Sequence, residues 1–379
     1  MKILQVCAAY KPAYVYGGPT MSVSMLSENL VRAGIYTEVY ATTANGKEEL
    51  PVIPGAQVNV DGVVVTYFKR LTKDHSHFSP ALFSQLKREV KNFDLVHIHA
   101  WWNLVSVFSC LLALRQNVPV LLSPRGTLSP YSFQNKSIGT KWLLHQLLGK
   151  SLLRKCFIHA TTQRESDAVA RLFRPKKSFI LPNFVKLTTK KIYLERANTS
   201  TLKLLFFSRI EEKKGLGILL KALPDITIPY HLTIAGDGDS EYIASLKALA
   251  TGLKVEEGIS WIGFQNENKF GLLQENDLFV LPSYDENFGN TVIESLSVGT
   301  PVLISDHVGL ADYVKKNQLG WICHTNPQSV AWEINNIFTN RQEELKMIRK
   351  TSADIIYHDF NDDNLVKKYI EMYQQLVAK

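Results

Sequence analysis

The sequence of 379 residues is poor in cysteine and contains neither a low-complexity tract nor a long hydrophobic run. Its four cysteines, Cys7, Cys110, Cys156 and Cys323, stand singly, without the paired spacing of a zinc cluster or a disulfide framework. The longest uncharged apolar stretch, residues 101–114, is shorter than the ~20 residues that a membrane-spanning helix requires. These absences exclude a disulfide-rich secreted domain and predict no transmembrane helix.

The amino terminus lacks the features of a secretory signal. Only a short apolar run separates Lys2 from Lys11 and Pro12, and this run is too brief for the apolar core of a signal peptide. We therefore expect a protein that acts in the cytoplasm or at the inner face of the cell membrane.

Composition indicates a folded protein with an uneven charge. Hydrophobic residues make up 45% of the chain and charged residues 21%, which excludes a disordered chain, and the length predicts two domains. Residues 1–185 carry 22 Lys and Arg against 10 Asp and Glu, whereas residues 186–379 carry 21 against 25. A basic first half suits nucleic acid, anionic lipid or a phosphorylated substrate, and solvated lysines are the ordinary alternative.

Short apolar runs alternate with helix-length segments along the whole chain. The predicted strands are 3–7, 37–41, 63–68, 95–98, 118–123, 157–160 and 179–182, and then 202–208, 231–236, 259–264, 278–282 and 301–305. Such alternation is typical of parallel, doubly wound sheets. The fold class we predict is α/β, with two tandem Rossmann-like domains that face a ligand cleft.

A polar segment, 186–201, suits a surface connection between the domains. We therefore predict an N-terminal domain over 1–185 and a C-terminal domain over 201–355. An amphipathic helical segment, 356–379, follows and is expected to pack back on the N-terminal domain.

The segment richest in chemistry runs from a predicted strand end through a loop into a helix. The helix is predicted to begin at Phe288, Gly289 and Asn290, where free backbone N–H groups favour an anionic or hydroxylated ligand. Glu286 lies in the loop and Glu294 about two turns further on, so both carboxylates can face one cleft. Such a pair suits sugar hydroxyls, although glutamates at this spacing also arise by chance.

Two cations, Arg209 and Lys214, follow the first strand of the second half. Together they suit a diphosphate, because Arg offers a planar fork and Lys a mobile point charge; a solvated Glu/Lys turn is the alternative. Gly236 begins a tight turn that lacks the third glycine of a dinucleotide fingerprint. Gly17 and Gly18 permit close backbone approach to a phosphate or sugar, or form a plain turn.

Two further candidates end strands of the first half. We expect the imidazoles of His97 and His99 to project to opposite faces of their strand, which argues against a shared metal and leaves His99 for the cleft. Arg125 follows the next strand and suits contact with an anionic donor or acceptor. A core or capping role for the histidines, and a surface ion pair for the arginine, are the alternatives.

In chain order these motifs resemble glycosyltransferase family 4, a family of retaining sugar-nucleotide transferases with the two-domain GT-B fold. The resemblance extends over residues 1 to about 325. The motifs that carry it are Arg209, Lys214-Gly215, Gly236-Asp237-Gly238, Leu281-Pro282-Ser283, the Glu286 and Glu294 pair around Phe288-Gly289, and Gly299-Thr300-Pro301-Val302.

The resemblance implies roles for matching residues. Arg209 and Lys214 would bind the donor diphosphate, Glu286 the hydroxyls of the transferred sugar and Glu294 the nucleotide ribose. The remaining contacts to the donor would come from loop residues, namely Gly17, Gly18, Gly236, Phe288, Gly289, Asn290 and Thr291. The N-terminal domain would bind the acceptor and the C-terminal domain the nucleotide sugar.

The sequence departs from the family at one position. Many members have a His before Gly where this chain has Pro124-Arg125-Gly126, so a role near the sugar passes to Arg125. The family's usual mechanism needs no metal ion, and no suitably placed DxD motif is present. We therefore expect no metal and no cofactor beyond the nucleotide-sugar substrate.

The resemblance implies a saccharide or lipid-linked saccharide acceptor and a place in bacterial surface polysaccharide assembly, with no nucleic-acid partner. The stretch 136–157 interleaves basic and apolar residues, which suits an anionic membrane surface or an ordinary core helix. A sugar-nucleotide epimerase or hydrolase of the same fold and a catalytically silent sugar-binding scaffold are the alternative functions.

Overall fold

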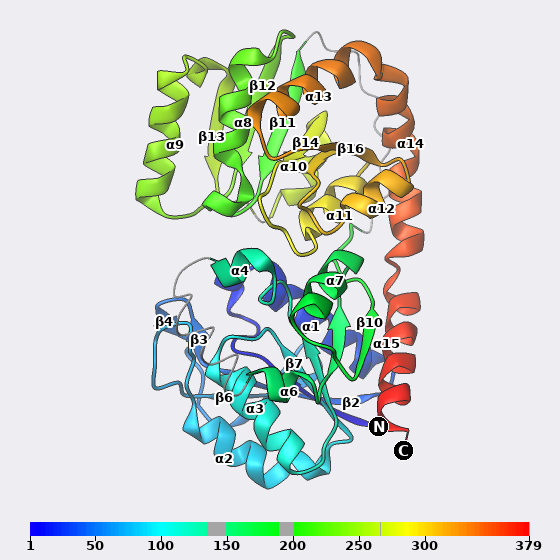
Figure 1. Cartoon of the computed structure of the whole chain (residues 1–379). Coiled ribbons are helices and arrows are strands. Elements are labelled where there is room, and N and C mark those ends of the chain that lie inside the picture. Colours follow the sequence, from blue (N-terminus) through cyan, green and yellow to red (C-terminus); the bar gives the residue numbers. More distant parts are fainter. Residues whose placement is uncertain (135–148, 189–200, 266, 379) are drawn as a thin grey trace. The chain divides into compact units, whose positions relative to one another are not determined.

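The computed structural model describes residues 1–134, 149–188, 201–265 and 267–378, and it divides into two compact units (Figure 1). The first unit consists of Met1–Val185 and Phe360–Lys379, and the second of Lys186–Asp359. Each unit has a central, mainly parallel sheet between helices, which confirms the α/β fold class with two parallel-sheet domains. Most of the predicted connection, 189–200, lies outside the described residues.

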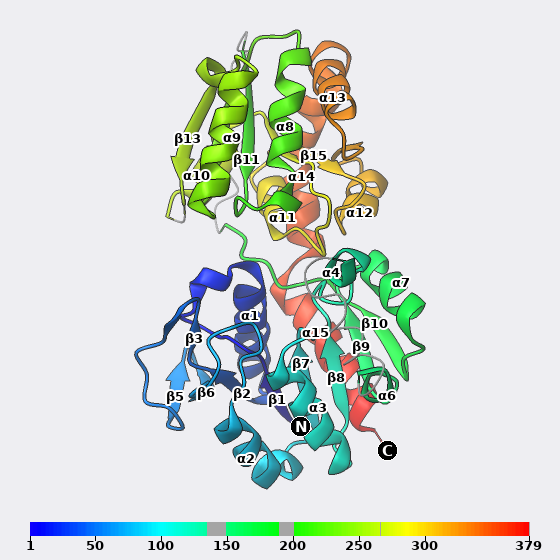
Figure 2. The same cartoon turned by 60° about the vertical axis from the view of Figure 1, so that its left-hand side comes forward.

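The sheet of the first unit has the order β10-β9-β8-β7-β1-β2-β6-β5, which can be followed in Figure 2. All neighbours are parallel except β5 and β6. The strands are β1 Lys2–Val6, β2 Tyr36–Thr42, β5 Gln57–Val60, β6 Val63–Phe68, β7 Leu95–His99, β8 Val120–Ser123, β9 Phe157–Ala160 and β10 Lys177–Ile180. The helices are α1 Gly18–Arg32, α2 Pro80–Glu89, α3 Leu104–Arg115, α4 Pro130–Gln134, α6 Lys150–Leu153, α7 Gln163–Leu172 and α15 Asp362–Val377, and a small hairpin pairs β3 Ala44–Asn45 with β4 Glu48–Glu49.

The second unit has a six-stranded, all-parallel sheet with the order β13-β12-β11-β14-β15-β16. The strands are β11 Leu202–Phe207, β12 Tyr230–Ala235, β13 Ile259–Gly263, β14 Leu278–Leu281, β15 Val302–Ser305 and β16 Gly320–Cys323. The helices are α8 Leu216–Ala222, α9 Ser240–Gly252, α10 Lys269–Glu275, α11 Asn290–Ser297, α12 Ala311–Lys316, α13 Pro327–Asn340 and α14 Gln342–Asp359.

Residue alternation decides what each face of the first sheet buries. Leu4, Val96 and Leu122 belong to one core cluster, which also contains α2 and α3 residues. Their neighbours Ile3 and Leu95 belong to another, formed with α1 and α15. Because side chains along a strand alternate between faces, the central strands β1, β7 and β8 are buried on both sides.

The last helix, α15, packs on the first unit although the chain has passed through the second unit before it. Its apolar face buries Leu365, Tyr369, Met372, Tyr373 and Leu376. The carboxyl-terminal segment therefore completes the core of the first unit.

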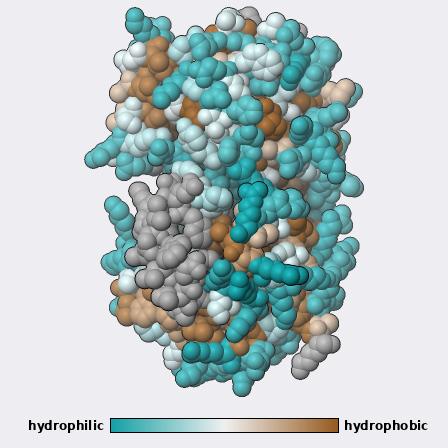
Figure 3. All heavy atoms as spheres, in the orientation of Figure 1, coloured by the Kyte–Doolittle hydropathy of each residue, from teal (hydrophilic) through white to brown (hydrophobic). Residues whose placement is uncertain are grey.

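On the face shown in Figure 3, hydrophobic residues form small groups among hydrophilic side chains. Within the described ranges, no helix is both long and apolar enough to cross a membrane.

Met372→Ala should lower the free energy of unfolding of the first unit by about 2–5 kcal/mol, because it leaves a cavity in a closed core. Urea unfolding followed by circular dichroism would measure the loss. Gln374→Ala, an exposed position on the same helix, is the matched control and should change stability by less than about 0.5 kcal/mol. Equal losses in both variants would contradict this packing.

Candidate active site

In the second unit the strand order reverses between β11 and β14, because β12 and β13 extend the sheet to one side and β15 and β16 to the other. Loops that follow two such strands diverge and leave room for a ligand at the carboxyl edge. The loop after β11 approaches the end of β14 so closely that a Cβ on Gly215 would lie 2.0 Å from the carbonyl oxygen of Pro282. Gly215 also has a φ of 75°, so glycine is required there twice over.

This close approach brings Lys214 and Glu286 together. The Lys214 ammonium forms an ion pair with Glu286 Oε2, and the two side chains are only 11% and 17% exposed. Burial alone would raise the pKa of Glu286, but Lys214, with Lys213 and Arg209, holds this pKa below its ordinary value. The carboxyl is therefore ionised at neutral pH and is a weak base.

Arg209 lies on the same loop but is exposed. Its guanidinium is 2.7 Å from Glu211 Oε1, and its side chain is 51% exposed. An exposed ion pair of this kind is worth less than about 1 kcal/mol and is easily exchanged for another anion. Burial, with the charge of Lys214, lowers the pKa of the neighbouring Lys213.

The helix α11 begins beside this pair. Gly289 is its N-cap, with a φ of 95°, and Asn290 and Thr291 form its first turn. The amides of a first helical turn have no partner within the helix and point along its axis toward the positive end of the helix dipole. Phe288 is buried, so its ring is not available to a ligand.

About one turn into α11, Glu294 is buried beside a lysine that sequence reasoning missed. Lys269, the first residue of α10, forms an ion pair with Glu294 Oε1. The other carboxylate oxygen, Oε2, is buried and has no hydrogen-bond partner among the described residues. A buried acceptor without a donor is costly, so a ligand hydroxyl that donated to Oε2 would be bound favourably.

Gly236 has a structural reason to be glycine. A Cβ at this position would lie 1.9 Å from the carbonyl oxygen of Ser208, at the end of the adjacent strand β11. The residue therefore lets the loops after β11 and β12 approach each other at the carboxyl edge of the sheet.

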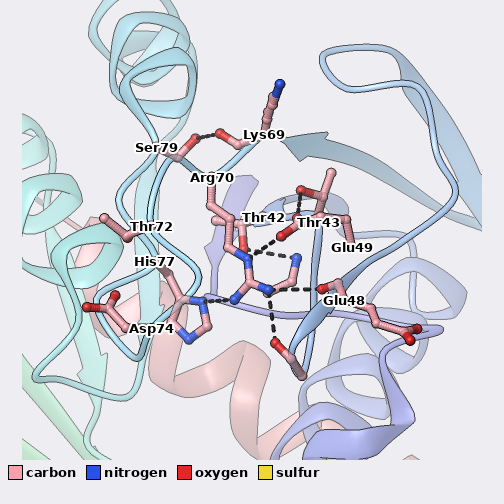
Figure 4. Close-up of polar contacts among 12 residues, drawn as sticks. Thr42, Thr43, Glu48, Glu49, Lys69, Arg70, Thr72, Asp74, His77 and Ser79 are labelled. Carbon is pink, nitrogen blue, oxygen red and sulfur yellow. Dashed lines mark hydrogen bonds and ion pairs between the residues drawn. The ribbon is translucent and has the colours of Figure 1, made fainter.

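In the first unit, the loop that contains Gly17 and Gly18 is supported by the β3–β4 hairpin, and a buried arginine holds this hairpin in place. Arg70, 1% exposed, donates from Nε to Glu49 Oε1 and from Nη2 to the carbonyl oxygens of Gly46 and Glu48, which fixes the β3–β4 hairpin (Figure 4). The Gly46 amide in turn donates to the hydroxyl of Tyr16 at 3.0 Å.

The hairpin thus supports the start of α1. Tyr16 immediately precedes Gly17, the N-cap of α1 with a φ of 65°, and Gly18 is the first residue of the helix. No atom would lie within 4 Å of a Cβ on Gly17, so this glycine serves its backbone conformation and not a close contact.

The expectation that His97 and His99 point to opposite faces is wrong. Residues two apart in a strand share a face, and their ring centroids lie 4.2 Å apart. Both are buried on the α15 side of the sheet, and their nitrogens are engaged in hydrogen bonds.

Those hydrogen bonds form one continuous chain. In order, Arg125 Nε donates to His99 Nδ1, His99 Nε2 to Gln5, Gln5 to Tyr373, Tyr373 to His97 Nδ1, His97 Nε2 to Ser123, Ser123 to His159 Nδ1, and His159 Nε2 to the carbonyl oxygen of Leu181. An arginine can only donate and a carbonyl can only accept, so Arg125 fixes His99 Nδ1 as an acceptor and Leu181 takes the Nε2 proton of His159. With all three imidazoles neutral, every donor between these two ends is then determined.

Burial, reinforced by Arg125, explains the neutrality. It holds the pKa values of His97 and His99 well below the ordinary range and lowers that of His159 to about 3. His99 is consequently a positioning residue for Arg125, since neither of its nitrogens is available to a substrate.

Sequence reasoning missed most members of this chain. Polar residues at alternate positions of buried strands were the available signal, because Gln5, His97 and Ser123 continue the face that begins with Ile3, Leu95 and Leu121. Tyr373 could not be assigned from sequence, since it lies 276 residues from His97.

Of the basic stretch 136–157, residues 136–148 lie outside the described residues. In the described part, α6 buries Leu152 and Leu153 in the core, while Arg154 and Lys155 are exposed. This part packs as an ordinary core helix.

The sequence matches two family models that together cover most of the chain. Residues 16–189 match the model described as Glycosyltransferase Family 4, and residues 191–354 match Glycosyl transferases group 1. The chain belongs to glycosyltransferase family 4. It is therefore a transferase with the GT-B fold, as the sequence motifs predict.

Curated relatives and a solved structure agree with this placement. An uncharacterized glycosyltransferase of Methanocaldococcus jannaschii is 26% identical over 99% of this chain and 98% of its own length. The amylovoran biosynthesis glycosyltransferase AmsK of Erwinia amylovora is 31% identical over 32% of each chain. Anabaena HepE, solved in complex with UDP and glucose, has a TM-score of 0.76 at 18% identity over 99% of this chain and 100% of its own, a likeness of fold.

The neutral histidines predict acid sensitivity. A histidine whose pKa is lowered by folding stabilises the protein fully above about pH 6.5, and this stabilisation is lost as the pH falls toward the folded value, about 3 for His159. His159→Gln should therefore make the decline in unfolding free energy below about pH 6 shallower by about 1.4 kcal/mol per pH unit.

Urea unfolding at several pH values would measure this slope. Gln keeps an acceptor for Ser123 and a donor for Leu181, which favours folding of the variant. His75→Gln, at an exposed position, is the control and should keep the wild-type slope. An unchanged slope in His159→Gln would show that His159 is not held neutral by the fold.

Proposed function

We propose that the protein is a retaining, metal-independent glycosyltransferase that moves a hexosyl group from a nucleoside diphosphate sugar to a saccharide or lipid-linked saccharide in surface polysaccharide assembly. The observation that carries the proposal is the buried Lys214–Glu286 pair at the point where the strand order reverses. Membership of the family supports sugar transfer, and similarity to relatives such as AmsK, a glycosyltransferase of amylovoran biosynthesis, supports the polysaccharide pathway.

The positive groups around this pair suit a leaving diphosphate. As the bond between the sugar and the diphosphate breaks, negative charge grows on the phosphate oxygens. Lys214, Arg209 and the first-turn amides of α11 can stabilise that charge without moving far. These groups supply the positive charge that a metal ion provides in other transferases, which is why we propose metal independence.

Glu286 suits a role in binding and orienting the sugar. Its lowered pKa makes it a good acceptor for sugar hydroxyls but a poor base and a poor candidate for protonation. In the proposed reaction the acceptor hydroxyl attacks from the side that the diphosphate leaves, and a leaving-group oxygen takes its proton. This geometry retains the configuration at the anomeric carbon.

Glu294 suits the ribose of the nucleotide. Its unpartnered Oε2 can accept a hydrogen bond from a ribose hydroxyl, while Lys269 balances the charge of the buried carboxylate. Cytoplasmic location and contact of the stretch 136–157 with an anionic membrane stay predictions.

A thermal-shift panel with UDP, GDP, ADP and TDP and their sugar conjugates tests the donor site. Binding to the folded state raises the melting temperature, so one nucleotide family should stabilise the protein. The ribonucleotide should then bind more tightly than the 2′-deoxyribonucleotide with the same base, and Glu294→Ala should remove this preference. A panel without any shift would contradict the proposal.

Glu286→Gln and Lys214→Met should each reduce sugar transfer by about 10²–10³-fold, because each removes a charge at the reacting centre. Release of nucleoside diphosphate from the donor identified by the panel is the measurement. Glu257→Gln and Lys221→Met make the same charge changes at exposed positions of the second unit and should leave the rate unchanged. Normal rates in both site variants would overturn the assignment.

A further inference from the structure

Arg125, at the carboxyl end of β8, has a guanidinium that is only partly satisfied by the protein. Nε donates to His99 Nδ1 at 3.2 Å, and Nη1 donates to Ser22 Oγ at 2.7 Å and Asn183 Oδ1 at 3.0 Å. These contacts use three of the five N–H donors of an arginine. Within the part of the chain that the structure describes, Nη2 makes no hydrogen bond.

Among the described residues, the guanidinium also lacks a counter-ion. No carboxylate of the described residues lies within 4 Å of it. Glu165, a buried acid on α7, instead accepts from the amides of Gly126 and Thr161 and from the Thr161 hydroxyl. Arg70 in the same unit differs, because its buried guanidinium forms a direct ion pair with the Glu49 carboxylate.

The surrounding groups cannot neutralise this charge. The imidazole that contacts Arg125 belongs to the chain of neutral histidines, in which every proton direction is fixed. Ser22 and Asn183 supply dipoles only. A partly buried cation held by neutral partners favours a negatively charged ligand.

The backbone around this position is strained as well. Arg125 has a φ of 52°, and Ala100, after the adjacent strand β7, has a φ of 65°. Residues other than glycine adopt such angles at an energetic cost, and these conformations concentrate at functional sites. The side chain is partly exposed, so a ligand can reach it.

We propose that Arg125 Nη2 binds an oxyanion carried by the saccharide that the first unit recognises, either the carboxylate of a uronic acid or a phosphate on a sugar. This inference rests on the proposed function and narrows the substrate to an acidic sugar. Arg125 would act as a specificity-determining residue, with His99, Ser22 and Asn183 holding its guanidinium in the orientation that leaves Nη2 available. Charge-assisted hydrogen bonds of this kind are the stronger ones in proteins.

Titration calorimetry of the whole chain with D-glucuronate, D-glucose 6-phosphate and D-glucose tests the proposal. At least one anionic sugar should bind about tenfold or more tightly than glucose. A preference for glucuronate alone would identify a carboxylate as the recognised group, and a preference for glucose 6-phosphate alone a phosphate. If neither anion binds to the wild-type protein more tightly than glucose, the proposal is wrong, and this comparison needs no variant.

Two variants assign the preference to the side chain. Arg125→Gln should abolish it, and Arg125→Lys should retain part of it, because lysine keeps the charge but not the planar fork. Arg115→Gln removes one charge from an exposed position at the far end of α3 and should keep the full preference. Persistence of the preference in folded Arg125→Gln would overturn the assignment.

The nucleotide panel on the same samples separates this proposal from the proposed function. Nucleotide binding depends on the second unit, so a nucleotide shift without an anion preference would refute only the role of Arg125. An anion preference without any nucleotide shift would support Arg125 as an anion-binding residue and contradict the transferase assignment.

Discussion

The single reversal of strand order in each sheet is the constraint on which the rest of the structure depends. In the first unit the reversal lies between β1 and β7, and in the second between β11 and β14. The predicted site residues Arg209, Lys214, Glu286 and Arg125 follow one of these strands or a strand next to them. Because right-handed connections between parallel strands place successive helices on opposite sides of a reversal, the loops separate there and leave polar groups exposed at the edge.

The two units handle buried charge in opposite ways. The second unit pairs each buried carboxylate near its reversal with a lysine, Glu286 with Lys214 and Glu294 with Lys269. The first unit surrounds a guanidinium with neutral dipoles instead. A pair that is already complete can exchange partners with a neutral, hydroxyl-rich ligand, whereas a lone cation favours a ligand that brings its own charge.

Much of the fold could be predicted from the sequence because buried parallel strands are short, continuous apolar runs. Residues 63–68 and 157–160 were predicted with the observed bounds. Besides the two-residue strands β3 and β4, the strands that were missed are β5 and β16. Both lie at sheet edges, where β5 alternates exposed polar residues and β16 begins with glycine. Edge strands carry a weaker apolar signal because one side of each lacks a neighbour.

In the candidate site, too, some residues could be predicted from local sequence patterns and others could not. Lys214, Glu286 and the start of α11 lie in loops whose neighbours are set by strand order, so their approach follows from local patterns. Lys269 on α10 forms its ion pair with Glu294 on the neighbouring helix α11, and no local sequence pattern indicates that contact. Contacts between residues distant in sequence depend on the packing of the whole unit, as the approach of Cys110 and Cys156 to 3.4 Å between sulfurs also shows.

The carboxyl-terminal helix α15 contributes a residue to the hydrogen-bond chain that reaches Arg125, in addition to its packing in the core of the first unit. Tyr373 on α15 is the donor to His97 and the acceptor from Gln5, so the hydrogen-bond chain between Arg125 and Leu181 passes through it. Without that hydroxyl Gln5 and His97 would no longer be linked, although Arg125, which can only donate, would still require a lone pair on His99 Nδ1. The hydrogen-bond chain that ends at Arg125 is therefore completed by a residue that follows the whole second unit in the sequence.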